Sequence, residues 1–187
     1  MANPNAPFGF APADDYSASR VRTYSIATGA DATIAVGDPV KLLDTGTVAL
    51  AAAGDRMLGV CQGVTYTGSD GKPVFGYWPA STAAADAKCH VAEFRPGTRW
   101  AIQAASVAST DVGLLADHVA GTASTTYNRS TAYLSGTMAN TNAGFRILGL
   151  SPLPRGNEPN AWGAYAVVIV EPFETEFSID DAATPGV

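Results

Sequence analysis

Apolar and polar residues alternate along most of this chain in short runs. Val40 and Leu42 share one face of a run, and Val48 and Leu50 share one face of the next. Between these runs lies Asp-Thr-Gly, in which Gly46 can take the positive φ of a tight turn. A period of two on either side of a turn predicts a β-hairpin, followed by a third strand after a polar loop.

The residues that follow continue the same pattern. Met57–Cys61 and Val64–Thr67 predict two pieces of strand, and Gly63 between them predicts a β-bulge. Gly68–Lys72, with the sequence GSDGK, has the composition of a hairpin tip. The stretch PVFGYWP then predicts a returning strand held between two prolines.

A later strand indicates how one sheet is covered. After a Pro-Gly turn, Trp100, Ile102 and Ala104 fall on one face, while Arg99 and Gln103 fall on the other. This alternation predicts a sheet with one buried face and one face in water.

The remaining segments decide the fold class. Tyr165–Val170 is apolar on both faces, which predicts a central strand. Ser81–Lys88 is the one stretch that favours a helix, because it is rich in alanine behind a capping serine or threonine. Asp111–Ala120 fits a short helix and a strand equally well. Many short strands separated by glycine and proline turns predict an all-β fold, a compact barrel or sandwich of short antiparallel strands.

The two ends differ from the β domain, which we expect at residues 23–170. Residues 171–187 form an acidic C-terminal tail. Residues 1–22 predict an extended N-terminal arm, because proline fixes φ and restricts the residue before it. Its aromatic side chains need a surface, either this domain's own flank or a neighbouring subunit. The prolines of the arm are Pro4, Pro7 and Pro12, and its aromatic residues are Phe8, Phe10 and Tyr16.

Composition narrows the classes of partner. The net charge is −6, and the basic residues are scattered, with Arg20 and Arg22 the nearest to a cluster. Nucleic acid and anionic membranes both require basic patches, so neither is an expected partner. The N-terminus lacks the features of a signal peptide, which predicts a soluble chain that is not exported by the usual route. Charged residues make up only 15% of the chain, which hints at a surface partly covered by other subunits.

Candidate catalytic groups are sparse. Cys89 and His90 are neighbours in a predicted strand, so their side chains point to opposite faces. A cysteine–histidine pair would therefore need Cys61 or His118 from elsewhere, and the spacing of these four residues does not match a structural zinc site. We expect reduced, half-buried cysteines, no metal, no cofactor and no enzymatic activity. The tryptophans can line a carbohydrate site, but such residues more often fill a core or an interface.

Two stretches resemble a known family. The opening MANPNAPFGFAP and the segment AVGDPVKLLDTGTVALAAAGDRMLGVCQGV are similar to capsid decoration proteins of tailed bacteriophages, also called cement or head-stabilising proteins. The resemblance covers residues 1–67. It implies a β barrel or sandwich, often a homotrimer, on the outer capsid surface of the virion. There such a protein contacts the major capsid protein and bridges neighbouring capsid subunits.

The resemblance and the arm together suggest an interface with the capsid or with another subunit. Aromatic side chains of the arm would anchor in apolar pockets of the partner. The predicted interface residues are Pro7, Phe8, Phe10, Tyr16, Arg20 and Arg22.

Three other readings stay open. One is a different structural role in the virion, such as a head–tail connector, tail or fibre subunit. Another is a glycan-binding module that uses the Thr/Ser-rich stretch 121–135 and the tryptophans. The third is an enzyme that depends on His90 or His118.

Overall fold

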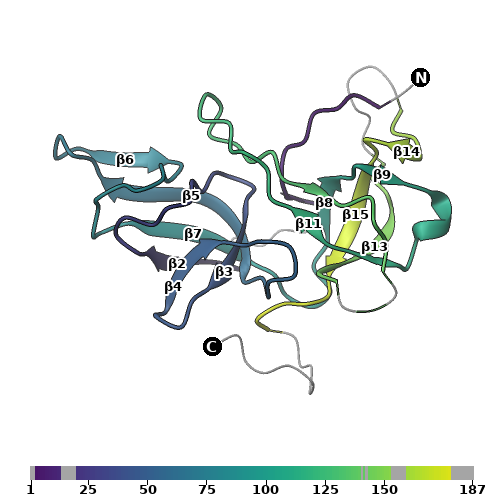
Figure 1. Ribbon diagram of the computed structural model, residues 1–187, viewed down its shortest axis with the longest axis horizontal. Helices are drawn as coiled ribbons and strands as arrows, with labels where there is room; N and C mark the ends of the chain where they lie inside the picture. Colours follow the sequence, from purple (N-terminus) through teal and green to yellow (C-terminus); the bar gives the residue numbers. More distant parts are fainter. Residues whose placement is uncertain (1–2, 14–19, 140, 142, 153–158, 178–187) are drawn as a thin grey trace.

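The computed structural model describes residues 3–13, 20–139, 141, 143–152 and 159–177, and the described chain is all-β, as the sequence predicts (Figure 1). A short 3-10 turn, η2, lies at Ser109–Asp111. No described helix is long and apolar enough to cross a membrane. The strands are β1 (Ala11–Pro12), β2 (Val21–Ile26), β3 (Pro39–Leu42), β4 (Thr47–Leu50), β5 (Gly59–Thr67), β6 (Pro73–Gly76), β7 (Lys88–Glu93), β8 (Trp100–Gln103), β9 (Ser106–Val107), β10 (Leu115–Ala116), β11 (His118–Val119), β12 (Tyr133–Leu134), β13 (Phe145–Leu150), β14 (Gly163–Ala164) and β15 (Val167–Pro172).

The first unit is a closed barrel. Its strands pair in the order β3-β4-β2-β7-β5, and β3 pairs with β5 to complete the ring. Strand β6 extends from β5 as the second arm of the predicted hairpin. All pairs are antiparallel except β2 with β4, which are parallel. The predicted bulge is confirmed, because the register of β5 against β7 shifts between Cys61 and Gly63.

The second unit is a five-stranded sheet in the order β1-β8-β15-β13-β10. Its central strand is β15, as predicted from the apolar run 165–170. Two short pairs, β11 with β12 and β9 with β14, complete the unit. Figure 1 shows the barrel and this sheet side by side, and the Pro-Gly turn between β7 and β8 is where the chain passes from one to the other.

Two hydrophobic cores hold the molecule together. The barrel interior is filled by Trp78 and by aliphatic and cysteine side chains. The other core lies between the units, where Val60 and Ala92 of the barrel pack with side chains of the second sheet. At its centre the Phe94 ring meets the Trp100 ring edge-on at 5.2 Å. Aromatic pairs in this geometry add to the stabilisation from burial, so the units share one core.

The predicted helix at 81–88 is wrong. The segment runs through turns and irregular chain, with Ser81 at a φ of 59°. Ala84 and Ala87 are buried in the barrel core. Small side chains are used here to close the barrel, and this packing overrides the helical propensity of alanine. The ambiguous stretch 111–120 forms mainly β10 and β11.

The expectation of a wet face is met at Arg99, which is exposed just before β8, but is wrong at Gln103. Gln103 is only 1% exposed, because the N-terminal segment of residues 3–13 covers that face. The Ala6 N–H donates to Gln103 Oε1 at 3.0 Å, and Gln103 Nε2 donates to the Pro4 carbonyl at 2.9 Å. The described part of the predicted arm is therefore docked on this domain's own flank, one of the two alternatives left open by the sequence.

Both predicted domain boundaries fall inside strands. Residue 22 lies in β2, and residue 170 lies in β15. Strand β1 pairs with β8 before the first boundary. After the second, the Phe177 ring packs on the barrel core, with the Arg95 guanidinium 3.8 Å from its centroid. The described residues at both ends thus belong to the folded body.

Candidate functional site

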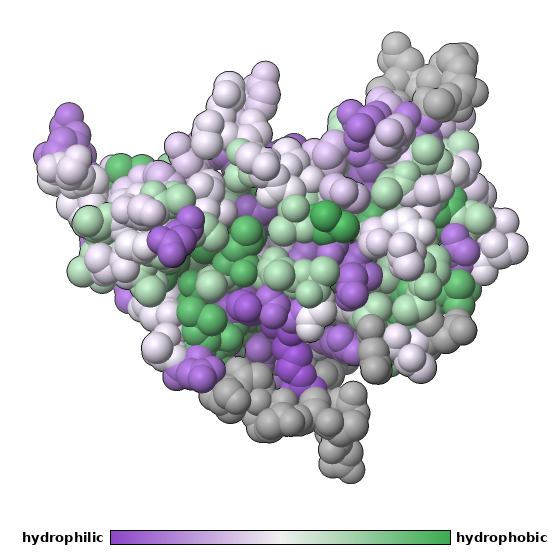
Figure 2. Space-filling view, viewed as in Figure 1, coloured by the Kyte–Doolittle hydropathy of each residue, from purple (hydrophilic) through white to green (hydrophobic). Residues whose placement is uncertain are grey.

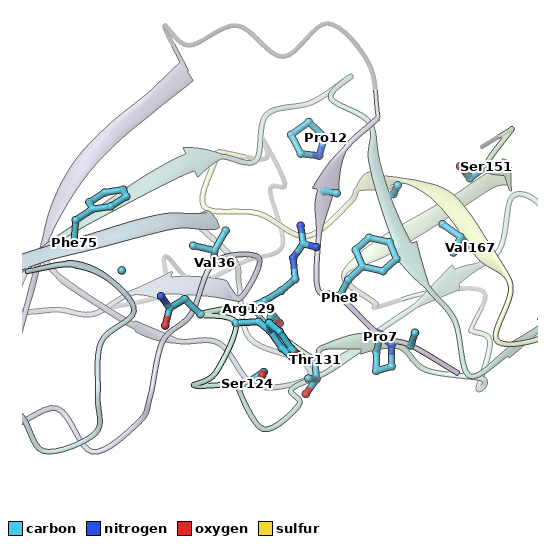
Figure 3. Close-up of a pocket in the computed structure, with 17 residues that line it drawn as sticks. Pro7, Phe8, Pro12, Val36, Phe75, Ser124, Arg129, Thr131, Ser151 and Val167 are labelled. Carbon is cyan, nitrogen blue, oxygen red and sulfur yellow. The ribbon is translucent and has the colours of Figure 1, made fainter. Parts of the chain in front are cut away.

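A groove lies where three segments meet. They are β6, the hairpin formed by residues 121–131, and the N-terminal segment (Figure 3). The groove has a volume of about 1070 Å³. It runs between two outer strands, because β6 ends the barrel sheet and β1 ends the second sheet. Both strands contain a proline, which lacks the N–H that a pairing strand needs and so discourages unwanted pairing.

Phe75 forms one wall of the groove and is 70% exposed. Its ring lies across the bulge in β5, so close that a β-carbon on Gly63 would come within 2.8 Å of it. The ring centroid is 6.2 Å from that of His90 on β7. The bulge glycine therefore leaves space for an exposed aromatic side chain on the outer face of the barrel.

Tyr127 is 81% exposed, on the 121–131 hairpin. The base of this hairpin is pinned to the barrel, since the Val36 N–H donates to the Asn128 carbonyl at 3.1 Å and the Ser130 N–H donates to the Val36 carbonyl at 2.8 Å. Figure 2 shows this hairpin and the β5–β6 hairpin standing out from the body. An exposed aromatic side chain on a pinned hairpin loses little freedom on binding, which favours a role as an anchor.

Arg129 is the only charged residue among the described residues that line the groove. Its side chain extends into the groove between Val36 and Phe8 in Figure 3. Among the described residues it makes no ion pair. The protein as a whole has a net charge of −6. The positive charge of Arg129 would therefore favour, at this groove, an apolar partner surface that carries a carboxylate.

The predicted interface residues of the arm separate into two sets. Pro7 and Phe8 are half-buried and line the groove. Phe10 is only 3% exposed and lies in the shared core, with its ring centroid 4.6 Å from that of Phe145 and 5.5 Å from that of Phe94. The prediction that Phe10 anchors in a partner is therefore wrong, because this domain has already buried it.

The remaining predicted interface residues lie apart from the groove. Arg20 and Arg22 are exposed at the start of β2, and neither lines the groove. The Arg22 guanidinium is 3.5 Å from the Glu93 carboxylate. Tyr16 lies outside the described residues.

Glu93 is the most heavily paired carboxylate among the described residues. It accepts hydrogen bonds from Tyr24 Oη at 2.5 Å and from the Arg95 guanidinium. Burial opposes its charge, but these bonds and the arginine charges outweigh burial and lower the pKa of Glu93. Burial and the bond to Glu93 raise the pKa of Tyr24 to about 12. This cluster fastens β2 to β7, and a carboxylate held ionised in this way is unsuited to donate a proton.

The two cysteines lie inside the barrel, and His90 lies on its outer face. Cys89 is buried inside the barrel, whereas His90 lies half-buried on the outer face, as the alternation predicts. Cys61 and Cys89 are free and completely buried, so the expected half-burial is wrong. The two thiols are close to each other inside the barrel. A hydrogen bond to Cys61, together with burial, raises the pKa of the Cys89 thiol.

His118 lies in the shared core, away from both cysteines. Its Nε2 is 3.0 Å from the Ala51 carbonyl, and burial lowers its pKa. The described residues contain no group of three histidine, cysteine, aspartate or glutamate side chains able to hold a metal ion.

Two of the tryptophans are structural. Trp78 fills the barrel and Trp100 the shared core, while Trp162 is 37% exposed. The groove residues Phe75, Tyr127 and Arg129 were missed by sequence reasoning. A tyrosine in a Thr/Ser-rich stretch was a usable signal, but the position of Phe75 opposite a bulge was not. No family model, curated protein or solved structure matches this chain.

Proposed function

We propose that this chain is a structural protein of a bacteriophage particle, and that it decorates the outer surface of the capsid. In this role it contacts the major capsid protein and bridges neighbouring capsid subunits, without making or breaking a covalent bond. The phage assignment is supported by the resemblance in residues 1–67. The structural role is supported by the surface around the groove.

The observation that carries the proposal is the pair of exposed aromatic side chains, Phe75 and Tyr127, that line the groove. Phe75 lies on β6, and Tyr127 lies on the 121–131 hairpin, which is hydrogen-bonded to Val36. Aromatic residues that become buried in an interface dominate its binding energy. A surface supplied by both units can transmit load through the shared core.

The acidic surface suits the outside of a capsid. A net charge of −6 disfavours contact with packaged DNA. Three copies around a threefold position, as a homotrimer, would each contribute a weak contact. When weak contacts are linked in one assembly, its overall affinity is much higher than that of a single contact.

Add-back of purified protein to particles that lack it tests this function. We expect Phe75→Ser and Tyr127→Ser each to weaken binding at least about tenfold, because each removes a central apolar contact. Val112→Ser is the matched control, since Val112 is 46% exposed beside η2 and does not line the groove. Unchanged binding by both aromatic variants would contradict the proposed surface.

A different virion role remains the second candidate. A connector, tail or fibre subunit would use the same exposed aromatic residues against a different partner. The number of copies in each particle distinguishes these roles from decoration.

A further inference from the structure

A second hollow adjoins the groove. We call it the neutral pocket. It has a volume of about 580 Å³ and lies between Asn5 and Pro7, the end of β8, and the base of the 121–131 hairpin. Pro7 and Thr131, both labelled in Figure 3, belong to the walls of both hollows. Its volume is within the usual range for sites that bind small molecules.

The described residues that line the neutral pocket include no aspartate, glutamate, lysine, arginine or histidine. Its polar groups are amides, threonine hydroxyls and the phenols of Tyr133 and Tyr165. A charged ligand would find no counter-charge there. The pocket therefore suits an uncharged ligand that both donates and accepts hydrogen bonds.

Four of these side chains have hydrogen-bonding capacity to spare. Asn5, Thr122, Tyr133 and Tyr165 line the pocket, and no side-chain hydrogen bond joins any of them to another described residue. Thr131 is different, because its hydroxyl donates to the Thr122 carbonyl at 2.6 Å. The four free groups can bind a ligand without first breaking a bond within the described protein.

Tyr165 is held in an unusual conformation. Its φ is 60°, in the left-handed region that side chains with a β-carbon avoid, and it is 37% exposed. Its N–H donates to the Ala105 carbonyl at 3.2 Å, and its carbonyl accepts from Gln103 Nε2 at 2.9 Å. Backbone strain that the surroundings enforce is concentrated at functional sites.

Gln103 also holds the wall of the neutral pocket that the N-terminal segment forms. The same side chain bonds to Pro4 and Ala6 of the N-terminal segment. One buried amide therefore fixes both the strained tyrosine and the segment that carries Asn5. This arrangement keeps the walls of the pocket in place before any ligand arrives.

We propose that the neutral pocket binds an uncharged carbohydrate. The face of a sugar ring carries C–H groups that pack on tyrosine, while its hydroxyls match the free amide, hydroxyl and phenol groups. The Thr/Ser-rich stretch thus contributes through Thr122 and Tyr133, and the tyrosines take the part that the sequence suggested for tryptophans. This is a function separate from capsid decoration, and it does not depend on it.

Binding to a printed panel of glycans tests the proposal. The panel contains neutral glycans ending in glucose, galactose, mannose or N-acetylglucosamine, and acidic glycans ending in sialic or uronic acid. We expect binding to at least one neutral class and to no acidic class. No binding to any glycan, or binding to acidic glycans alone, would overturn the proposal.

Three variants assign the binding to the pocket. Tyr165→Gly removes the ring and also relieves the strained φ, so we expect at least about tenfold weaker binding with an unchanged or higher Tm. Thr122→Val should weaken binding by less. Val112→Ser changes an exposed side chain that lines neither hollow, and it should bind as the original chain does. Full binding by Tyr165→Gly, or equal loss in Val112→Ser, would overturn the assignment.

Discussion

The barrel and the second sheet bury their apolar side chains in different ways. The barrel closes on itself, and its interior contains side chains from the first half of the chain plus Phe177 at its margin. The second sheet has no separate interior. Its core is completed by Val60, Ala92 and Phe94 from the barrel side and by Phe10 from the N-terminal segment. The barrel should therefore be the more self-sufficient unit, and the second sheet should depend on it.

Phe10→Ala is expected to have the largest effect on this difference. Removing a fully buried phenylalanine costs about 3–5 kcal/mol, and the loss falls on the core shared by both units. Hydrogen exchange should show β8 and β15 losing protection before β5 and β7. Phe8→Ala is the control, because Phe8 is only half-buried and should cost roughly 1 kcal/mol. Equal loss of protection in both units would show that the barrel is no more self-sufficient than the sheet.

A change at the barrel bulge should act on the barrel and on the groove together. Gly63 has a φ of 150°, and an added β-carbon would lie 2.8 Å from the Phe75 ring. We expect Gly63→Ala to lower the free energy of unfolding by about 2–3 kcal/mol, mainly from strain at a φ that residues with a β-carbon rarely adopt, because the exposed Phe75 ring can move aside. Gly71 has a φ of 77°, in the left-handed region that other residues also visit, and has open space around it. Gly71→Ala should cost only about 1 kcal/mol, so similar costs in urea titrations would contradict this account of the bulge.

A pH titration examines the junction between the two units. Asp38 is 1% exposed, its Oδ2 accepts from the Ala35 N–H at 2.8 Å, and the neighbouring Gly37 carbonyl accepts from the Phe10 N–H at 2.9 Å. Burial raises its pKa from 3.8 to about 6, while hydrogen bonds from Ser130 and Ala35 oppose the rise. The folded state therefore binds this proton more tightly than the unfolded state does.

The contribution of Asp38 to stability is present in full below its unfolded pKa and is lost as the pH rises through its folded pKa. We expect Asp38→Asn to gain stability relative to the original chain between about pH 4 and pH 8, by roughly 2–3 kcal/mol. The difference between the two chains isolates this group from His118, whose lowered pKa acts in the opposite direction. A difference that is constant across this range would show that Asp38 does not titrate as described.

The smallest effect is expected at Arg22, where β2 meets β7. Its side chain is 64% exposed, and its ion pair with Glu93 spans 3.5 Å. Exposed pairs of this kind contribute less than about 1 kcal/mol. Arg22→Ala should therefore leave the urea midpoint of both units nearly unchanged, and a loss well above that value would mean that the Glu93 cluster depends on Arg22.

The sequence predicts the barrel better than the second sheet for a physical reason. The hairpin around Gly46, the bulge at Gly63 and the tip at 68–72 depend on neighbouring residues, so local alternation and turn chemistry reveal them. The second sheet pairs β1 with β8 and β8 with β15. No local pattern reports pairing over such separations, and the coverage of Gln103 by the N-terminal segment could not be foreseen.

The candidate sites were less predictable than the fold. Pro7 and Phe8 were found because proline and aromatic residues stand out in an extended segment. Phe75, Arg129 and Tyr165 come together with them only through tertiary structure. The helix expected at 81–88 failed because alanine serves there as a small buried residue, a use that helical propensity does not reveal.

The central proposal, decoration of a capsid, is tested most directly by counting copies of this chain in virus particles purified from the source of the sequence. The count is made against the major capsid protein after density-gradient purification. Decoration predicts a copy number comparable to that of the capsid protein. A handful of copies would contradict decoration in favour of a connector or tail role, and complete absence from the particle would contradict any structural role in the virion.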